Sequence, residues 1–331
     1  MKFLEPSGMM GTAFLSHGEK KMFEEWGGKR YNSFNYHLKS LFGEKVYKVA
    51  LDAGFTCPNR DGSIGTGGCI FCDAGGSRAG YVDPDIPVED QLIRGMEAIS
   101  RQTGAKKFIA YFQAFSNTYA PIKRLEALYR SVVKFDEVVG ISISTRPDLV
   151  PNEILDLIED IAKEKYLWLE LGVQTMKDET LRFLNRGHSV AENIDAIKRA
   201  KARPNTRVLA HVIIGLPGES EEEILSNARS LSLLGIDGIK IHHLYVVENT
   251  LLASLYEKGE IKLFENVDEF ADIATKFLEH LSPNVIIHRL QGFARSGLIA
   301  PAWTSNKFIG VQKIEELLEV RNTFQGRNFN R

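Results

Sequence analysis

The three cysteines of this sequence lie within one short segment. Eleven residues separate Cys57 from Cys69, and two residues separate Cys69 from Cys72. Thiolates bind soft metals and iron–sulfur clusters, and the glycines of the segment let its backbone turn tightly. Three thiolates can hold a four-iron four-sulfur cluster and leave one iron open for a ligand. The spacing therefore predicts that Cys57, Cys69 and Cys72 form a metal site at which chemistry takes place.

A zinc site is the main alternative to a cluster. Structural zinc takes four ligands, and the segment from Cys57 to Cys72 contains no histidine and no further cysteine. A distant histidine such as His37 or His211 would have to complete the set. Three unrelated buried cysteines are a poor explanation, because all three fall within sixteen positions.

The elements that must position these cysteines alternate between short β-branched runs and longer amphipathic stretches. Parallel strands need long crossover connections, so this alternation predicts a parallel sheet, either doubly wound or curled into a partial barrel. No Gly-x-Gly-x-x-Gly turn follows the first run, and its absence argues against a dinucleotide-binding fold. The expected strands are 46–51, 107–113, 137–144, 167–173, 207–213 and 238–244, and the expected helices are 88–103, 121–134, 152–163, 178–199 with a break near residue 187, and 220–234.

Composition sets the broad class. The 331 residues are 44% hydrophobic and 25% charged, which is typical of a globular protein with a full core. No run approaches the roughly 18 apolar residues of a membrane span, and Glu5 and Pro6 fall where a signal peptide would be apolar. We therefore expect a cytoplasmic protein that does not enter a membrane. We expect a lead-in at 1–45, a core at 46–245, and an extension at 246–331 with a helix at 267–281, a strand at 284–288 and a helix near 308–320.

Charge is distributed unevenly along the chain. Residues 17–48 and the tail 320–331 each carry a net charge of +3, whereas the intervening residues 49–319 and the whole chain are net negative. Aromatic residues are interleaved with these basic ends, a combination that suits a nucleic-acid backbone and stacked bases. Solvated surfaces at the two ends would explain the same pattern.

Polar residues follow the expected strands at the points where those strands end. Function gathers at the carboxyl ends of strands in a parallel barrel, although helix caps and turns use the same residue types. His242 and His243 end the sixth strand, and because side chains alternate, only one of them can point inward. The candidates for holding a cofactor or substrate are Gln113, Asn117, Ser144, Arg146, Glu170 and Gln174.

These motifs resemble the radical S-adenosylmethionine (radical SAM) superfamily, in which a Cys-x-aromatic-Cys segment follows the first strand. The eleven-residue spacing is similar to that of the radical-SAM subunit of Elongator and its bacterial relatives. Closer still is the YtqA/YhcC family, which the sequence resembles at 30–34, 51–62, 111–121, 144–148, 170–175, 185–188 and 321–326. The resemblance covers roughly residues 30–327 and falls in order along the chain.

The resemblance implies a partial (β/α)6 TIM-like barrel with an N-terminal lead-in and a C-terminal α/β extension. It implies a 4Fe-4S cluster on the three cysteines, with S-adenosylmethionine bound at the open iron and cleaved to a 5'-deoxyadenosyl radical. Gln113 to Asn117 would stand in for the Gly-Gly-Glu that commonly holds the cofactor's amino group. Arg186 would approach the cofactor, and the turn at Gly215 would lie beside adenine.

The resemblance also implies a substrate and partners. Relatives of the YtqA type act on the wobble uridine of tRNA and remove the carboxymethyl group from 5-carboxymethylaminomethyl(2-thio)uridine to leave the aminomethyl form. A separate tRNA methyltransferase would act next, and a flavodoxin- or ferredoxin-like donor would supply electrons. Two alternatives stay open: a radical SAM enzyme acting on a peptide or metabolite, and a zinc-containing RNA-binding protein without catalysis.

Overall fold

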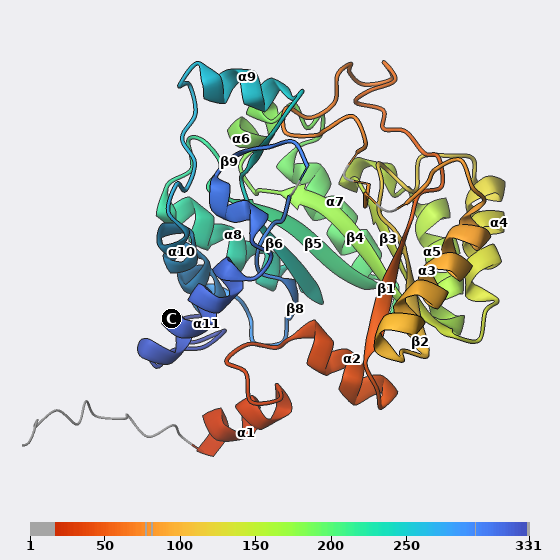
Figure 1. Ribbon diagram of the computed structural model, residues 1–331, viewed down its shortest axis with the longest axis horizontal. Coiled ribbons are helices and arrows are strands. Elements are labelled where there is room, and N and C mark those ends of the chain that lie inside the picture. Colours follow the sequence, from red (N-terminus) through yellow and green to blue (C-terminus); the bar gives the residue numbers. More distant parts are fainter. Residues whose placement is uncertain (1–16, 77, 81, 295, 330–331) are drawn as a thin grey trace, which may run out of the picture.

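Seven parallel strands form the central sheet of this protein. The computed structural model describes residues 17–329 apart from 77, 81 and 295. The strands lie side by side in the order β1-β2-β3-β4-β5-β6-β8 and curl into a half-barrel (Figure 1). Their bounds are β1 Val46–Leu51, β2 Lys107–Phe112, β3 Val138–Thr145, β4 Tyr166–Gln174, β5 Arg207–Ile214, β6 Gly238–His243 and β8 Ile286–Arg289.

Helices cover the outer face of this sheet. The outward side chains of the strands, such as Ile141, Leu169 and Ile241, are fully buried against them. Serine caps fix the start of two helices, because Ser189 and Ser220 each form a capping box with the glutamate three residues on. The covering helices are α3 Val88–Thr103, α4 Ile122–Val133, α5 Asn152–Glu164, α7 Val190–Lys201, α8 Glu221–Leu233 and α10 Val267–His280.

Smaller elements complete the described chain. Strands β7 Val246–Val247 and β9 Leu298–Ala300 pair antiparallel in a separate two-stranded sheet. Helix α11 packs on α10, and α6 precedes α7 in the chain. The remaining bounds are α1 His17–Glu25, α2 Phe34–Phe42, α6 Asp178–Phe183, α9 Leu251–Glu257, α11 Ile309–Val320, and the short 3-10 helices Pro147–Leu149 and Ala302–Ser305.

Helix α2 closes the amino end of the barrel. Its Phe34 ring stacks on His288 at 3.6 Å between centroids and meets Trp168 edge-on at 5.8 Å. The carbonyl of Phe42 accepts a hydrogen bond from Lys107 Nζ at the start of β2. The cysteine segment lies at the opposite, carboxyl end of the strands (Figure 1). The lumen of the barrel therefore has a closed apolar floor and opens toward the cysteines.

The structure confirms the partial barrel and adds to it. A doubly wound sheet reverses its strand order at a switch point, and the uninterrupted order of β1 to β6 has no such reversal. All six expected strands and all the expected helices are present, with ends shifted by one or two residues. The sheet gains a seventh strand, β8, from the segment expected to be an extension, and β8 pairs with β6 in parallel.

The two basic ends of the described chain pack against each other. Phe23 meets Phe324 edge-on at 5.5 Å, and Arg327 forms an ion pair with Glu19 at 2.6 Å. Several of the other cations are paired too, including Arg30 with Glu319. Both ends lie away from the cysteine segment (Figure 1). Arg331 and residues 1–16 fall outside the described residues.

None of the helices in the described part of residues 17–329 is long and apolar enough to cross a bilayer.

Candidate active site

The cysteine segment is a tight loop held by its own backbone. The amides of Arg60 and Asp61 both donate to the carbonyl of Cys57, at 2.8 and 3.2 Å, and the Cys72 amide donates to the carbonyl of Cys69 at 3.0 Å. Gly67 and Gly68 have φ values of +81° and +79°, a conformation that side chains with a Cβ disfavour. All three cysteines are free thiols. The glycines thus turn the chain so that the three thiols stand on one loop.

Each thiol of this loop has an arginine as its neighbour. Arg186 Nη1 lies 3.1 Å from the sulfur of Cys69, and Arg146 Nη1 lies 4.0 Å from the sulfur of Cys57. Burial raises the pKa of the Cys72 thiol to about 11, and the positive charge of Arg60 acts in the opposite direction. A guanidinium beside a sulfur favours the thiolate, which is the form that binds iron.

The segment after α6 is hydrogen-bonded to the cysteine loop. Asn185 Nδ2 donates to the carbonyl of Gly68 at 2.8 Å, and Asn59 Nδ2 donates back to the carbonyl of Asn185. Gly187 has a φ of +66°, and a Cβ there would stand 2.9 Å from Cγ2 of Ile64. The expected break near residue 187 therefore has a reason: the backbone leaves the helix to bring Arg186 to Cys69.

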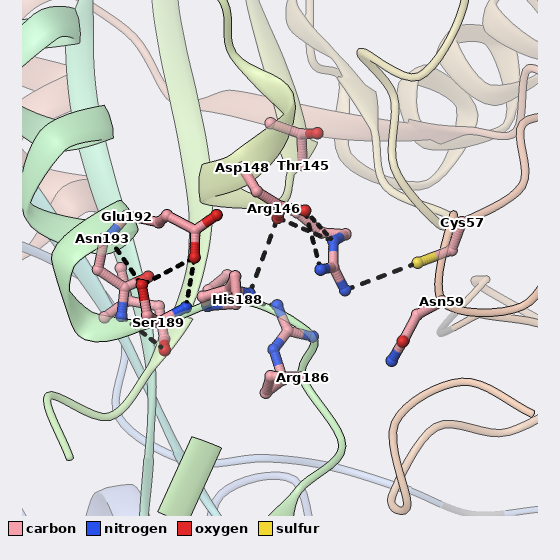
Figure 2. Close-up of polar contacts among 12 residues, drawn as sticks. Cys57, Asn59, Thr145, Arg146, Asp148, Arg186, His188, Ser189, Glu192 and Asn193 are labelled. Atoms are coloured by element: carbon pink, nitrogen blue, oxygen red, sulfur yellow. Dashed lines mark hydrogen bonds and ion pairs between the residues drawn. The ribbon is translucent and has the colours of Figure 1, made fainter. Parts of the chain in front are cut away.

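Arg146 is held by the carboxylate of Asp148, and the ring of His188 lies near the same carboxylate. Its Nε and Nη2 each lie 3.0 Å from the carboxylate of Asp148, and His188 Nδ1 is 3.8 Å from the same carboxylate (Figure 2). Burial and the charges of Arg186 and Arg146 lower the pKa of His188 to about 2, so its ring is neutral. Asp148 of the same chain thus binds the Nε and Nη2 atoms of Arg146, while Nη1 faces the sulfur of Cys57.

Asn117 is fully buried in the loop that follows β2. Its side-chain amide donates to the carbonyls of Phe112, Ala114 and Ser144 at 3.2, 3.0 and 2.9 Å. This side chain therefore fixes the loop that follows β2 to the end of β3.

Three other expected positions lie at the same end of the barrel. Gln113 directly follows β2 and is half-buried. Gln174 ends β4 with a φ of +66°, and its side-chain nitrogen and that of Arg186 both lie close to Gly172. Gly215 follows β5 with a φ of +87°, and the ring of Phe264 occupies the space where its Cβ would stand, at 2.4 Å. Because Gly215 has no side chain, the ring of Phe264 can pack directly against its backbone.

Glu170 and Ser144 lie deeper, in a polar layer inside the lumen. Glu170 is completely buried and forms ion pairs with Lys48 at 2.7 Å and with Lys240. Ser144 Oγ donates to Glu170 at 3.1 Å, and Tyr111 accepts from Lys240 Nζ at 2.9 Å. Both carboxylate oxygens of Glu170 thus already have protein partners. The layer was not expected as a unit, although a lysine or glutamate in the middle of a buried strand was a signal that could have revealed it.

The histidines proposed to complete a zinc site lie elsewhere. His37 Nε2 is 2.8 Å from the Tyr166 hydroxyl at the floor of the barrel, and His211 Nε2 is 2.8 Å from Glu170 in the lumen. Over the described part of the chain, no three His, Cys, Asp or Glu side chains converge where one metal ion could be held. Cys57, Cys69 and Cys72 would instead hold an iron–sulfur cluster without a histidine ligand.

His242 and His243 point in opposite directions, as the alternation of a strand predicts. His243 is buried outward, 2.7 Å from Thr304 Oγ1 and packed on Trp303. His242 faces the lumen, where its ring lies 6.0 Å from that of His211.

Family models match most of the chain. The Radical SAM superfamily model covers residues 60–231, and the Radical_SAM C-terminal domain model covers residues 236–320. The chain belongs to the radical SAM superfamily. It is 40% identical to the uncharacterized protein YtqA of Bacillus subtilis over 306 residues, 92% of this chain and 94% of that protein. It is 37% identical to the protein YhcC of Escherichia coli over 292 residues, 88% of this chain and 93% of that protein.

More distant radical SAM similarities lead to Elongator-type proteins. A tRNA uridine(34) acetyltransferase of Methanocaldococcus infernus is 31% identical over 131 residues, 38% of this chain and 23% of that protein. The structure of the Elp3 protein from the same archaeon, with its N-terminus deleted, superposes with a TM-score of 0.59 at 18% identity, covering 85% of this chain and 64% of that one. The structural likeness confirms the fold.

Radical SAM proteins use a 4Fe-4S cluster and S-adenosylmethionine, and these are the cofactors of this chain. The cysteine loop fits the cluster, because three free thiols on one loop each have a cationic neighbour that favours the thiolate. When bound, the two groups supply a carbon-centred radical that can abstract hydrogen from a substrate. The chain's own part is to hold the thiolates, orient the substrate and exclude water.

Proposed function

We propose that this radical SAM enzyme modifies tRNA at the wobble uridine. The reaction proposed is removal of the carboxymethyl group from 5-carboxymethylaminomethyl(2-thio)uridine, leaving the aminomethyl nucleoside for a separate methyltransferase. The observation that carries the choice of tRNA is the 31% identity to a protein named a tRNA uridine(34) acetyltransferase. The specific modification is the one that the resemblance to the YtqA family implies, and the likeness to YtqA extends along nearly the whole chain.

Within this proposal the expected residues take different parts. Cys57, Cys69 and Cys72 bind the cluster, and Arg146 and Arg186 stabilise the thiolates. Gln113, Gln174 and the turn at Gly215 contact S-adenosylmethionine, while Asn117 fixes the loop after β2. Ser144 and Glu170 shape the lumen in which the substrate base lies. The enzyme works in the cytoplasm and receives electrons from a flavodoxin- or ferredoxin-like protein.

The test begins with protein reconstituted anaerobically with iron and sulfide, then reduced and given S-adenosylmethionine. The substrate is tRNA from cells that lack the last modification steps, and the products are 5'-deoxyadenosine and the digested nucleosides, both measured by mass spectrometry. We expect 5'-deoxyadenosine and the aminomethyl nucleoside to appear together, and both to vanish in Cys57→Ala, Cys69→Ala and Cys72→Ala.

Other results would point to the alternatives. Formation of 5'-deoxyadenosine with unchanged tRNA nucleosides would refute tRNA as substrate and favour a peptide or a metabolite. A colourless protein that holds one zinc ion and makes no 5'-deoxyadenosine would refute the enzymatic function and favour an RNA-binding protein.

A further inference from the structure

The lumen of the barrel contains more positive than negative charge. Lys48, Lys240 and Arg289 face it from β1, β6 and β8, and Glu170 is the carboxylate with which both lysines pair. The side chains of Tyr111 and His211 beside these residues are uncharged. Burial raises the pKa of Tyr111 well above its usual value, and burial with the charge of Lys240 lowers the pKa of His211 to about 4.

Arg289 is the unpaired member of this layer. A register shift between β6 and β8 places it directly beside Lys240, and paired residues on adjacent strands lie on the same face of a sheet. Such irregularities commonly re-aim a side chain at a site. No described residue forms an ion pair or hydrogen bond with the Arg289 side chain, which is exposed. Its guanidinium therefore stands in the lumen with its donors available.

Electrostatic effects agree with this placement. The charge of Arg289 lowers the pKa of Lys48, Lys240 and His242, in each case adding to a larger effect of burial. Burial raises the pKa of Tyr245; the charge of Arg289 acts in the opposite direction, and Asp73 and Cys72 of the cysteine loop add to the increase. The charge of Arg289 thus acts on the lysine layer and on a tyrosine that is also affected by the cysteine loop.

Two inward side chains at this level remain accessible to solvent. The side chain of Lys48 retains 21% exposure and that of His211 retains 20%, although both point inward and Glu170 below them has none. A site that gathers three cations around one carboxylate, and leaves the most accessible cation unpaired, is complementary to an anion.

We propose that Arg289, supported by Lys48 and Lys240, binds a carboxylate carried by the substrate and so selects substrates that have one. A planar guanidinium matches a carboxylate with two parallel hydrogen bonds. This inference rests on the proposed function: when a nucleotide enters the lumen base first, its backbone phosphates stay outside, and the anion that reaches Arg289 is on the substituent of the base. The carboxymethylaminomethyl group ends in such a carboxylate.

The test compares ligands that differ by the carboxymethyl group. Binding of 5-carboxymethylaminomethyluridine and of 5-aminomethyluridine to the reconstituted, unreduced holoenzyme is measured by calorimetry, both as free nucleosides and within otherwise identical tRNAs. We expect the carboxymethyl form to bind about ten to a hundred times more tightly, the range for a hydrogen bond between charged groups. Arg289→Gln should abolish this preference, and Arg289→Lys should restore part of it.

Arg94→Gln is the matched control, because it removes one exposed arginine on the outer helix α3 and should keep the preference. Affinity for S-adenosylmethionine is measured in parallel and should not change in Arg289→Gln. A loss of S-adenosylmethionine binding with the preference intact would overturn the inference, since Arg289 would then hold the cofactor.

The two proposals fail separately. If the tRNAs are bound and modified but wild-type protein does not distinguish the two forms, the carboxylate site is refuted and the tRNA function stands. If neither tRNA binds but the free nucleosides show a preference that requires Arg289, the carboxylate site stands and tRNA is refuted.

Discussion

Arg186 Nη1 lies 3.1 Å from the sulfur of Cys69, although 117 positions separate the two residues. The same guanidinium donates through Nη2 to the carbonyl of Gly172 at 2.8 Å, so the end of β4 fixes its position. The side chain is buried, which strengthens its interaction with a thiolate. The segment after α6 thereby controls a ligand on the loop after β1.

Replacing Arg186 should weaken the hold on the cluster. In Arg186→Gln the Cys69 sulfur loses a charge-assisted hydrogen bond, worth about 1.5–3 kcal/mol, so we expect iron to be lost about ten times faster or more. The measurement is iron content and visible absorbance over time in the presence of a chelator. Arg182→Gln, an exposed arginine of the same stretch paired with Glu179, is the control. Equal iron loss in wild type and Arg186→Gln would contradict the role.

Gly187 should be needed for the same reason, and the chain offers a matched comparison. Gly187 and Gly259 have φ values of +66° and +73°, but only at Gly187 would a Cβ meet a neighbour, Ile64 at 2.9 Å. Alanine at either position costs about 1–2 kcal/mol of backbone strain. Gly187→Ala should in addition displace Arg186 and speed iron loss, whereas Gly259→Ala should leave iron loss unchanged. Identical behaviour of the two variants would show that the contact with Ile64 does not matter.

The sequence was sufficient to predict the strands and the cluster loop. Each strand is a short run rich in apolar residues, many of them β-branched or aromatic, and the cysteines lie within sixteen positions of one another, so both can be recognised locally. The position of β8 in the sheet could not be recognised locally, because its pairing with β6 brings together residues more than forty positions apart. Helix α2 was detectable in principle: Ser33 caps it, Phe34, Leu38 and Phe42 share one face, and Gly43 ends it.

The site was less predictable than the fold. Asn117 was expected to hold a cofactor or substrate because it follows the second strand, and Glu170 because it lies near the end of the fourth. Such positions also need internal partners, and the structure surrounds both side chains with protein groups. The pairing of arginines with thiols depends on three separate loops meeting above the barrel. Charged residues such as Lys48 and Lys240 inside buried strands were visible in the sequence, yet only the barrel shows that they share one layer.

The buried ion network should be intolerant of losing its carboxylate. Glu170→Gln leaves Lys48 and Lys240 together without the carboxylate that both contact, so we expect the free energy of unfolding to fall by about 3–5 kcal/mol. Urea unfolding at pH 7 measures this change. Glu260→Gln, at an exposed position, should change it by about 0.5 kcal/mol or less. A similarly small effect at Glu170 would mean that the network does not stabilise the fold.

Buried histidines should make the protein sensitive to acid. Burial lowers the pKa of His243 to about 3, below the 6.5 of an unfolded histidine. The stability that this difference provides is complete above pH 6.5 and is lost as the pH falls, because the unfolded chain then binds a proton that the native chain does not. Between pH 4 and 6, His243→Gln should lower the slope of unfolding free energy against pH by about 1.4 kcal/mol per unit. An unchanged slope would refute a neutral buried His243.

Two lysines of helix α1 offer a test of RNA contact that does not touch the active site. Lys20 and Lys21 are exposed, and no described residue pairs with their side chains, whereas Arg321 forms an ion pair with Asp272. Free cations release counterions from RNA, so Lys20→Glu with Lys21→Glu should reduce the slope of log Kd against log salt for tRNA by about 1–2. Arg321→Glu should change this slope less and should instead lower stability. Because α1 lies at the end of the barrel away from the cysteines, an unaffected slope would place tRNA on the carboxyl face alone (Figure 1).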